Sequence, residues 1–198
     1  MILKSNRNDL QQLEGILNSF ILSKTIPSIE IILDEPVEYL LKKTQEIEIT
    51  NLDSLISNFE EMDVMSAVYV KCGGDLNIGV LWYMLEEESK PFALKLLGKY
   101  HLKEFDTLAV SSISEIGNIL TASIVNAICD EVGCQIYSSA PGFAVESLRT
   151  LLEALASDFG DQSDTIIASA VEFYGLNSGI KLKMLLIQDP TETKRLIV

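Results

Sequence analysis

The sequence predicts an α+β fold built from a duplicated unit, in which long helices pack on a mixed β-sheet. Three observations support this prediction. Segments with the apolar spacing of amphipathic helices alternate with runs typical of paired strands. The second half of the chain repeats the first at an offset of 100 residues. No stretch rich in Pro, Gly or Ser separates the halves, so we expect one domain over residues 1–198.

The repeat is clearest where two ten-residue stretches align without gaps. "LNIGVLWYML" (76–85) and "LNSGIKLKML" (176–185) share five identical pairs. The same offset pairs 94–98 with 194–198, and Ile16, Asn18 and Ser23 with Ile116, Asn118 and Ser123. We therefore divide the chain into repeats of about 1–104 and about 105–198, related by a pseudo-twofold axis.

Each half is predicted to contain the same elements in order. These are a long helix, a short strand, a turn with proline, a second helical segment, a β-hairpin and a last helix. In the first half they are expected at 7–25, 28–34, Pro36, 52–59, 64–72 with 78–85, and 88–102. In the second half they are expected at 105–132, 134–139, Pro141, 145–159, 165–174 with 179–187, and 191–198, where the last helix is cut short.

The charge and cysteine content of the chain indicate which kinds of molecule it binds and in which compartment it works. The chain has 15 basic and 29 acidic residues and a net charge of −14. Nucleic acid and anionic membrane surfaces would be repelled, so proteins are the expected partners. The three cysteines, Cys72, Cys129 and Cys134, lack C-x-x-C spacing and are predicted to be reduced thiols in a cytoplasmic protein. The N-terminus turns polar after three residues, and no apolar run approaches the roughly 18 residues of a membrane span, so neither a signal peptide nor membrane insertion is expected.

The helix expected at 105–132 has two different faces. At about 100° per residue, Ser111, Glu115, Asn118 and Ala122 fall on one side. The opposite side carries the apolar residues Ile113, Ile116, Leu120, Ile124 and Ala127, the expected core stripe. Gly117 and Asn118 both weaken a helix interior. This is typical of a surface that another molecule approaches closely, although a carboxylate and an amide side by side also fit a plain solvated face.

The spacing on this helix resembles a family signature. CheC-type chemotaxis phosphatases (CheC, CheX and the flagellar-switch relative FliY) carry Asp or Ser, three residues, Glu, two residues, Asn, twenty-two residues, Pro. Ser111, Glu115, Asn118 and Pro141 match every fixed position and every spacing. The resemblance extends over the whole chain, because CheC is itself a tandem duplication of about this length.

The resemblance implies hydrolysis of the aspartyl phosphate on a CheY-like response-regulator receiver. It implies catalytic roles for Asn118, which would hold the attacking water, and Glu115, which would pair with the receiver's lysine. Ser114, beside Ser111 and Ala122, would belong to the receiver-docking face, and Gly117 and Pro141 would be structural. No cofactor or metal is expected on this chain, since Mg²⁺ would be bound by the receiver.

Two other functions remain open at this level. A non-catalytic adaptor would bind the receptor deamidase CheD or a flagellar-switch component, and the helix at 145–159 is a candidate CheD surface. A homodimer with an acidic, merely solvated surface and a partner unrelated to chemotaxis is the third possibility.

The first half departs from the signature. CheC proteins often hold two active sites, but Gly15 stands where Glu115 stands in the second half, and Leu41 replaces Pro141. Only Asn18 remains, and Glu14 lies about 100° away around its helix. We therefore predict a degenerate first site and one working site, in the second half.

Overall fold

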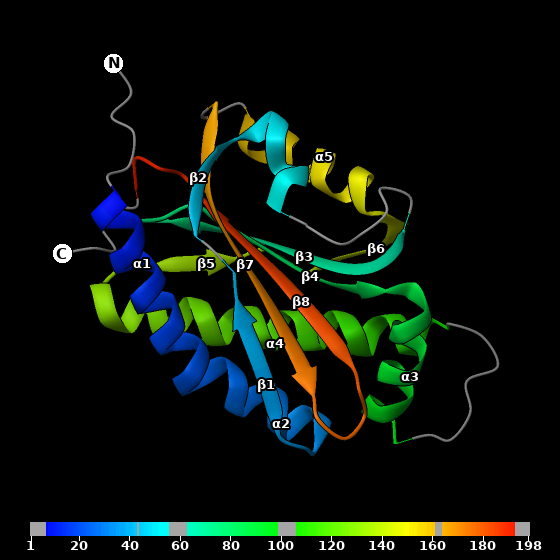
Figure 1. Ribbon diagram of the computed structural model, residues 1–198. Helices are drawn as coiled ribbons and strands as arrows, with labels where there is room; N and C mark the ends of the chain where they lie inside the picture. The colour runs from blue at the N-terminus through cyan, green and yellow to red at the C-terminus, as the bar shows by residue number, and fades with distance from the viewer. Residues whose placement is uncertain (1–6, 43, 56–62, 99–105, 161–163, 193–198) are drawn as a thin grey trace.

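In the computed structural model, residues 7–42, 44–55, 63–98, 106–160 and 164–192 are described. They form an eight-stranded antiparallel sheet with helices on both faces (Figure 1). The first half contains α1 (Arg7–Phe20), a π-helical turn η1 (Ile21–Thr25), α2 (Ile26–Leu33), β1 (Val37–Leu41), β2 (Gln45–Glu48), a 3-10 segment η2 (Ile49–Leu55), β3 (Val64–Gly74), β4 (Ile78–Leu85) and α3 (Glu86–Leu96). The second half contains α4 (Thr107–Val132), β5 (Ile136–Ser138), β6 (Gly142–Ser147), α5 (Leu148–Gly160), β7 (Thr165–Gly175) and β8 (Lys181–Gln188).

The sheet interleaves the two halves. Its strand order is β1-β7-β8-β4-β3-β5, with β2 also on β7 and β6 also on β3. Each half supplies one hairpin, and the hairpins join through β4 and β8, where Leu81 faces Leu185. The outer strands of each half pair with the hairpin of the other half. This is the arrangement of a pseudo-twofold axis that passes between β4 and β8.

The core is divided into two layers by the sheet. Helices α1, α2, α3 and α4 cover one face, while α5 and η2 cover the other (Figure 1). The first layer includes Leu13, Trp82 and Phe173, and the second includes Leu155 and Ile187. Strand β4 is buried on both faces, and this explains its nearly continuous apolar sequence.

The α+β class is confirmed, but the expectation of a mixed sheet is wrong. Every pairing between described strands is antiparallel. In the two hairpins, and where the short outer strands join them, each strand runs opposite to its neighbour. Antiparallel pairs of this kind need only short connections, whereas parallel pairs need a crossover of a dozen residues or more.

The strand expected at 28–34 is also wrong, because this segment is helix α2. Its isoleucines favour a strand by local propensity. Ile29 and Leu33 are both buried, however, and this four-residue spacing places them on one helical face against the core. The helix ends at Asp34 in the left-handed conformation (φ 50°), and the strand β1 begins after Pro36.

The other elements follow the predicted order with shifted bounds. The hairpins and α4 lie where they were expected, whereas strands β1, β2 and β6 were not anticipated. Strand β6 occupies the start of the predicted helix at 145–159, which begins at Leu148. The predicted helix at 52–59 is described only as the 3-10 segment η2, and the one at 88–102 as α3. Helix α3 ends at Leu96, and residues 97–98 form a turn, so the predicted helix is too long at this end. Residues 56–59, 99–102 and 193–198 of the predicted helices lie outside the described part of the chain.

Two helical stretches are long and apolar enough to cross a membrane, residues 7–33 and 107–132. This test rests on length and composition alone, and core helices of soluble proteins pass it as well. Leu17, Ile29, Leu120 and Ile124, two from each stretch, are buried in the layer between the helices and the sheet. Apolar residues of both stretches therefore pack in the protein core.

Candidate functional site

Helix α4 carries the candidate site and is fixed at both ends. The Asp106 side chain accepts a hydrogen bond from the backbone N–H of Ala109 (2.9 Å) and so caps the first turn. At the other end Gly133 adopts φ 68°, and its N–H donates to the carbonyl of Cys129 (2.9 Å). The 26 residues between these caps form a long, well-anchored support for the stripe in its middle.

The predicted stripe lies on the outer side of α4. Ser111 and Glu115 are exposed, while Asn118 and Ala122 are half-buried. Glu115 and Asn118 stand three residues apart, so their side chains are neighbours on the helix surface. Within the described residues, neither side chain has a hydrogen-bond partner. Within that part of the chain, both polar groups are uncommitted.

Ser114 is placed differently from the other stripe residues. Its side chain is half-buried, and its hydroxyl donates to the carbonyl of Val110 within the same helix (2.8 Å). A hydroxyl engaged in this way contributes a small, smooth surface next to Glu115 rather than a free donor.

Gly117 points the other way, into the core. A Cβ atom there would lie 2.6 Å from Cγ1 of Val68 on β3 and 2.8 Å from its Cβ. The missing side chain lets α4 rest close to the strand beneath it. The close approach expected at this glycine is therefore made by the protein's own sheet, not by an external molecule. The helical spacing contained this signal, since Gly117 falls between Ile113 and Leu120 on the core side.

Pro141 lies immediately before strand β6, next to the same region of the sheet. Gly142 and Phe143 pair with Tyr69 and Val68 of β3. Val68 is also the residue on which Gly117 packs. The structure thus places the proline and the α4 stripe on neighbouring elements, with β3 as their common support.

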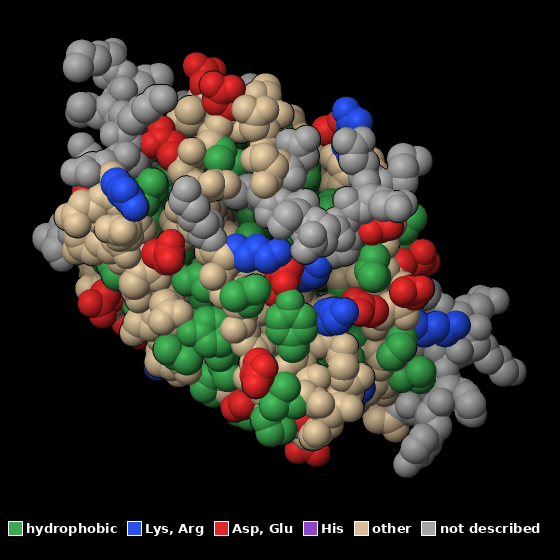
Figure 2. Space-filling model, viewed as in Figure 1, with side chains coloured by type: hydrophobic (Ala, Val, Ile, Leu, Met, Phe, Trp, Pro, Cys, Tyr) green, Lys and Arg blue, Asp and Glu red, His purple; other side chains and the backbone are tan. Residues whose placement is uncertain are grey.

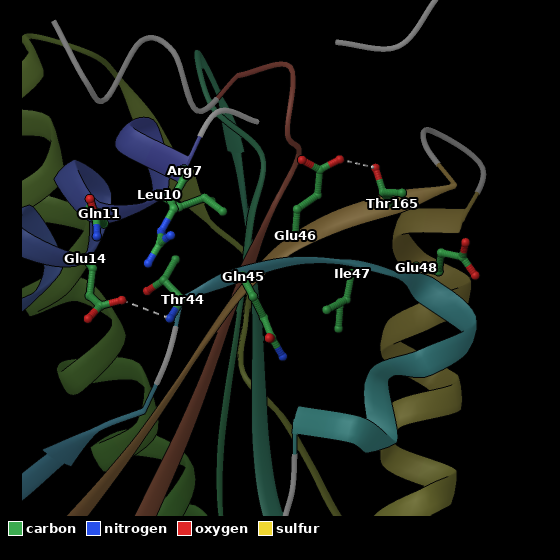
Figure 3. Close-up of a pocket in the computed structure, with 10 residues that line it drawn as sticks. All are labelled: Arg7, Leu10, Gln11, Glu14, Thr44, Gln45, Glu46, Ile47, Glu48 and Thr165. Atoms are coloured by element: carbon green, nitrogen blue, oxygen red, sulfur yellow. Dashed lines mark hydrogen bonds between the residues drawn. The ribbon is translucent and has the colours of Figure 1, made fainter. Parts of the chain in front are cut away.

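The equivalent site in the first half is occupied by internal contacts. The Tyr39 hydroxyl donates to Oδ1 of Asn18 (2.6 Å), and the Glu14 carboxylate accepts from the backbone N–H of Thr44 (3.2 Å). Figure 3 shows Glu14 directed from α1 toward Thr44. Gly15 is exposed and supplies no functional group. Asn118 and Asn18 therefore occupy matching positions, but only Asn118 has an uncommitted amide in the described structure.

Sequence reasoning missed the residues that close the first site. Tyr39 stands where the second half has Ser139, and it lies on β1, a strand that was not predicted. A neighbouring pocket, shown in Figure 3, lies between α1 and β2. It is lined by polar side chains such as Gln11 and Glu46, and the Thr165 hydroxyl on β7 donates to Glu46 on the paired strand β2 (3.3 Å). No pattern in the sequence signals this pocket, because its wall is the unpredicted strand β2.

The charged surface is consistent with the acidic composition. Figure 2 shows acidic side chains spread over the visible face, with basic ones both near its middle and toward its edges. Glu172 on β7 pairs with Lys42, which directly follows β1 (2.6 Å), and with Lys183 on β8 (3.6 Å). Among the residues that the structure describes, no group of three His, Cys, Asp or Glu side chains is arranged to hold a metal ion.

Comparisons with known protein sequences give a match over half of the chain. No protein-family model matches the chain. The CheY-P phosphatase CheC of Bacillus subtilis (strain 168) is 24% identical over 107 residues, which are 52% of this chain and 51% of CheC. The matched region therefore spans about half the length of each protein.

Solved structures match over nearly the whole chain. Thermotoga maritima FliY superimposes with a TM-score of 0.71 at 15% identity, covering 99% of this chain and 96% of FliY. A chain of the FliG–FliM complex from H. pylori superimposes with a TM-score of 0.65 at 14% identity, covering 96% of this chain and 100% of that chain. A chain of the CheX–CheY–BeF3–Mg²⁺ complex from Borrelia burgdorferi superimposes with a TM-score of 0.53 at 14% identity, covering 90% of this chain and 97% of that chain. At these identities the structural matches establish the fold.

Proposed function

We propose that this chain, which has the CheC/FliY fold and resembles a CheY-P phosphatase in sequence, is a phosphatase for a CheY-like response regulator. The reaction is hydrolysis of the aspartyl phosphate on the receiver domain, which ends its signal. One observation carries the proposal. Glu115 and Asn118 stand side by side on α4, at the spacing of the CheC-type signature, and neither side chain has a hydrogen-bond partner among the residues that the structure describes.

Asn118 positions the attacking water in this proposal. Its amide both donates and accepts, so it can orient a water molecule in line with the bond between phosphorus and the aspartyl oxygen. Water adds to phosphorus, the aspartate leaves as a carboxylate, and inorganic phosphate is released. An acyl phosphate bound to the receiver's Mg²⁺ is already activated, so the main task of this chain is positioning.

Glu115 sets the register of the complex. An exposed carboxylate one turn before Asn118 can pair with the lysine of the receiver's phosphorylation site. Exposed ion pairs contribute little affinity, about 0–1 kcal/mol, so its role is orientation rather than tight binding. Ser111, Ser114 and Ala122 keep the rest of the stripe small and allow the helix to enter the site.

The proposed setting is the cytoplasm, where receivers act. A chain of a CheX–CheY complex shares this fold, which supports a receiver as partner. The net charge of −14 favours a partner surface with basic groups, including the receiver lysine. CheD is a further proposed partner, with α5 as its candidate surface.

The test is the decay of a phosphorylated cognate receiver in the presence of Mg²⁺, with and without this protein. The wild type is expected to accelerate decay, and Asn118→Ala to reduce that acceleration by at least 100-fold, about 2.7 kcal/mol at the transition state. Glu115→Ala is expected to weaken the acceleration mainly by misaligning the receiver, with little change in receiver affinity. The matched control is Asn18→Ala, which removes the same amide from the first half and is expected to leave the acceleration intact.

A second outcome would identify an adaptor. If the wild type binds the phosphorylated receiver, or CheD, or a flagellar-switch component, without shortening the phosphoryl lifetime, the catalytic assignment of Asn118 fails. The stripe would then serve recognition only. Circular dichroism of each variant separates this result from loss of the fold.

A further inference from the structure

Two of the three thiols meet at the corner where α4 ends. Cys129 belongs to the last turn of the helix, and Cys134 follows Gly133 on the way to β5. Their sulfur atoms are 3.7 Å apart, with the Cys134 thiol donating toward the Cys129 sulfur. Both residues are half-buried free cysteines, and the proposed phosphatase reaction uses neither.

The corner that brings them together is held from both sides. Gly133 in the left-handed conformation turns the chain back across the last helical turn, with its N–H on the carbonyl of Cys129 (2.9 Å). Immediately after Cys134, the Gln135 carbonyl accepts from the Asp75 N–H, and the Gln135 N–H donates to the Asp75 carboxylate, both at 2.9 Å. The two thiols are therefore presented to each other by a fixed backbone.

The two sulfurs have different roles in their shared contact. Burial, followed by the hydrogen bond to Cys129 and the charge of Asp75, raises the pKa of Cys134 to about 11. Cys134 therefore keeps its proton and acts as the donor. Cys129 accepts that S–H contact, so its sulfur lies within reach of the Cys134 sulfur, and we assign it as the attacking group.

The third thiol provides an internal contrast. Cys72 on β3 is 1% exposed, lies in the core, and contacts the Ser138 hydroxyl (3.5 Å). Burial raises the pKa of Cys72, so it is both inaccessible and protonated. An oxidant in solution reaches Cys129 and Cys134 first.

We propose that Cys129 and Cys134 are a modification site, at which a reversible disulfide forms by exchange with a low-molecular-weight disulfide such as oxidised glutathione. The Cys129 thiolate attacks one sulfur of the oxidant, whose S–S bond breaks and releases one glutathione thiolate. Cys134 loses its proton to solvent and attacks the Cys129 sulfur, releasing the second glutathione. The protein loses two electrons, and the oxidant gains them as two thiols.

The geometry allows the bond to close by a small movement. The sulfurs must move from 3.7 Å to about 2.05 Å, a change within reach of side-chain rotation. Cytosolic disulfides in general are transient rather than structural. The bond would tie the end of α4 to the segment that leads into β5 and on to Pro141.

The test treats the folded, reduced full-length chain with oxidised glutathione, quenches with acid, alkylates the free thiols with N-ethylmaleimide and measures intact mass. The wild type is expected to lose two of its three alkylatable thiols and to regain them with dithiothreitol. Cys72→Ser, the matched control, is expected to lose both remaining thiols in the same way. Cys129→Ser and Cys134→Ser are expected to form only mixed disulfides with glutathione.

Several results would overturn the proposal. These are three alkylated thiols in the treated wild type, a stable mixed disulfide that never closes, a bond that involves Cys72 on peptide mapping, or a crosslinked dimer on a non-reducing gel. The wild-type measurement decides by itself, so misfolding of a serine variant does not obscure the result. Since receiver dephosphorylation is not the readout, failure here is independent of the proposed function.

Discussion

Gly117 shows how one absent methyl group positions the candidate site. The side chains around it are core residues, and Val68 occupies the space that a Cβ atom would need. The helix accepts the intrinsic cost of an interior glycine, about 1 kcal/mol relative to alanine. In return α4 lies close to β3, and this sets the height at which Glu115 and Asn118 stand above the sheet.

Gly117→Ala is therefore expected to destabilise the fold by about 1–3 kcal/mol, since overpacking outweighs the better helix propensity of alanine. Urea unfolding measures the change. The matched control is Gly15→Ala on α1, where an added Cβ meets no atom within 4 Å. This variant is expected to stabilise the protein by about 0.5–1 kcal/mol.

The double variant Gly117→Ala with Val68→Ala tests the cause. If the clash is with Val68, the two losses are expected to be non-additive, with a favourable coupling of about 1 kcal/mol. Additive losses would instead locate the cost of Gly117→Ala elsewhere in the helix.

At the scale of single elements, the turn between β7 and β8 is held by a buried carboxylate. Glu35, which lies just before β1, accepts from the backbone N–H groups of Asn177 (2.8 Å) and Ser178 (2.7 Å), from the Ser178 hydroxyl and from Lys95 (3.1 Å). Burial alone would raise the pKa of Glu35, but these hydrogen bonds outweigh it and lower the pKa to about 2.

This shift predicts how stability depends on pH. Because the pKa in the folded state lies below the ordinary value of 4.5, the contribution of Glu35 is complete above pH 4.5 and is lost as the pH falls toward about 2. Glu35→Gln is expected to destabilise the protein by about 3 kcal/mol at pH 7 and to flatten the acid limb of the stability curve. Urea unfolding from pH 7 to pH 3 measures both effects.

Glu38→Gln is the control for that experiment. Glu38 is exposed on β1, and its loss is expected to leave the acid limb unchanged. An unchanged limb in Glu35→Gln as well would show that other carboxylates govern acid unfolding.

Elements with strong local signals could be predicted from the sequence. The two hairpins and α4 combine long apolar patterns with clear turn or capping residues, so their sequences determine them locally. Helix α2 could not be predicted in this way, because its isoleucines favour a strand and only packing on the core makes it helical. The α4 stripe followed from spacing alone. The hydrogen bond from Tyr39 to Asn18 could not be predicted, because it depends on β1, and local sequence patterns do not indicate that β1 pairs with β7.

At the scale of the whole molecule, each half stabilises the hairpin of the other. Glu35 of the first half holds the turn at Asn177, and Glu192 of the second half accepts from the backbone N–H (2.6 Å) and side-chain amide (2.9 Å) of Asn77. The outer strands of each half likewise pair with the hairpin of the other half. The two repeats therefore share one sheet and one pair of core layers.

Fragments 1–104 and 105–198, prepared separately, are thus expected to lack cooperative unfolding. An equimolar mixture is expected to recover it, because the crossed strands and the two turn contacts can then form between chains. Circular dichroism during thermal unfolding, with size-exclusion chromatography, measures this. Cooperative melting of either fragment alone as a monomer would show that the halves are independent.

The pairing of β4 with β8 also has a consequence during protein synthesis. Strand β4 is apolar on both faces, and its partner ends about 100 residues later, at Gln188. At about 5–20 residues per second, the ribosome leaves one edge of β4 open for roughly 5–20 s. An unpaired apolar edge invites association with other nascent chains. The central contact of the finished sheet is therefore open while the second half of the chain is being made, and a chaperone that covers β4 in this interval would raise the yield of native protein.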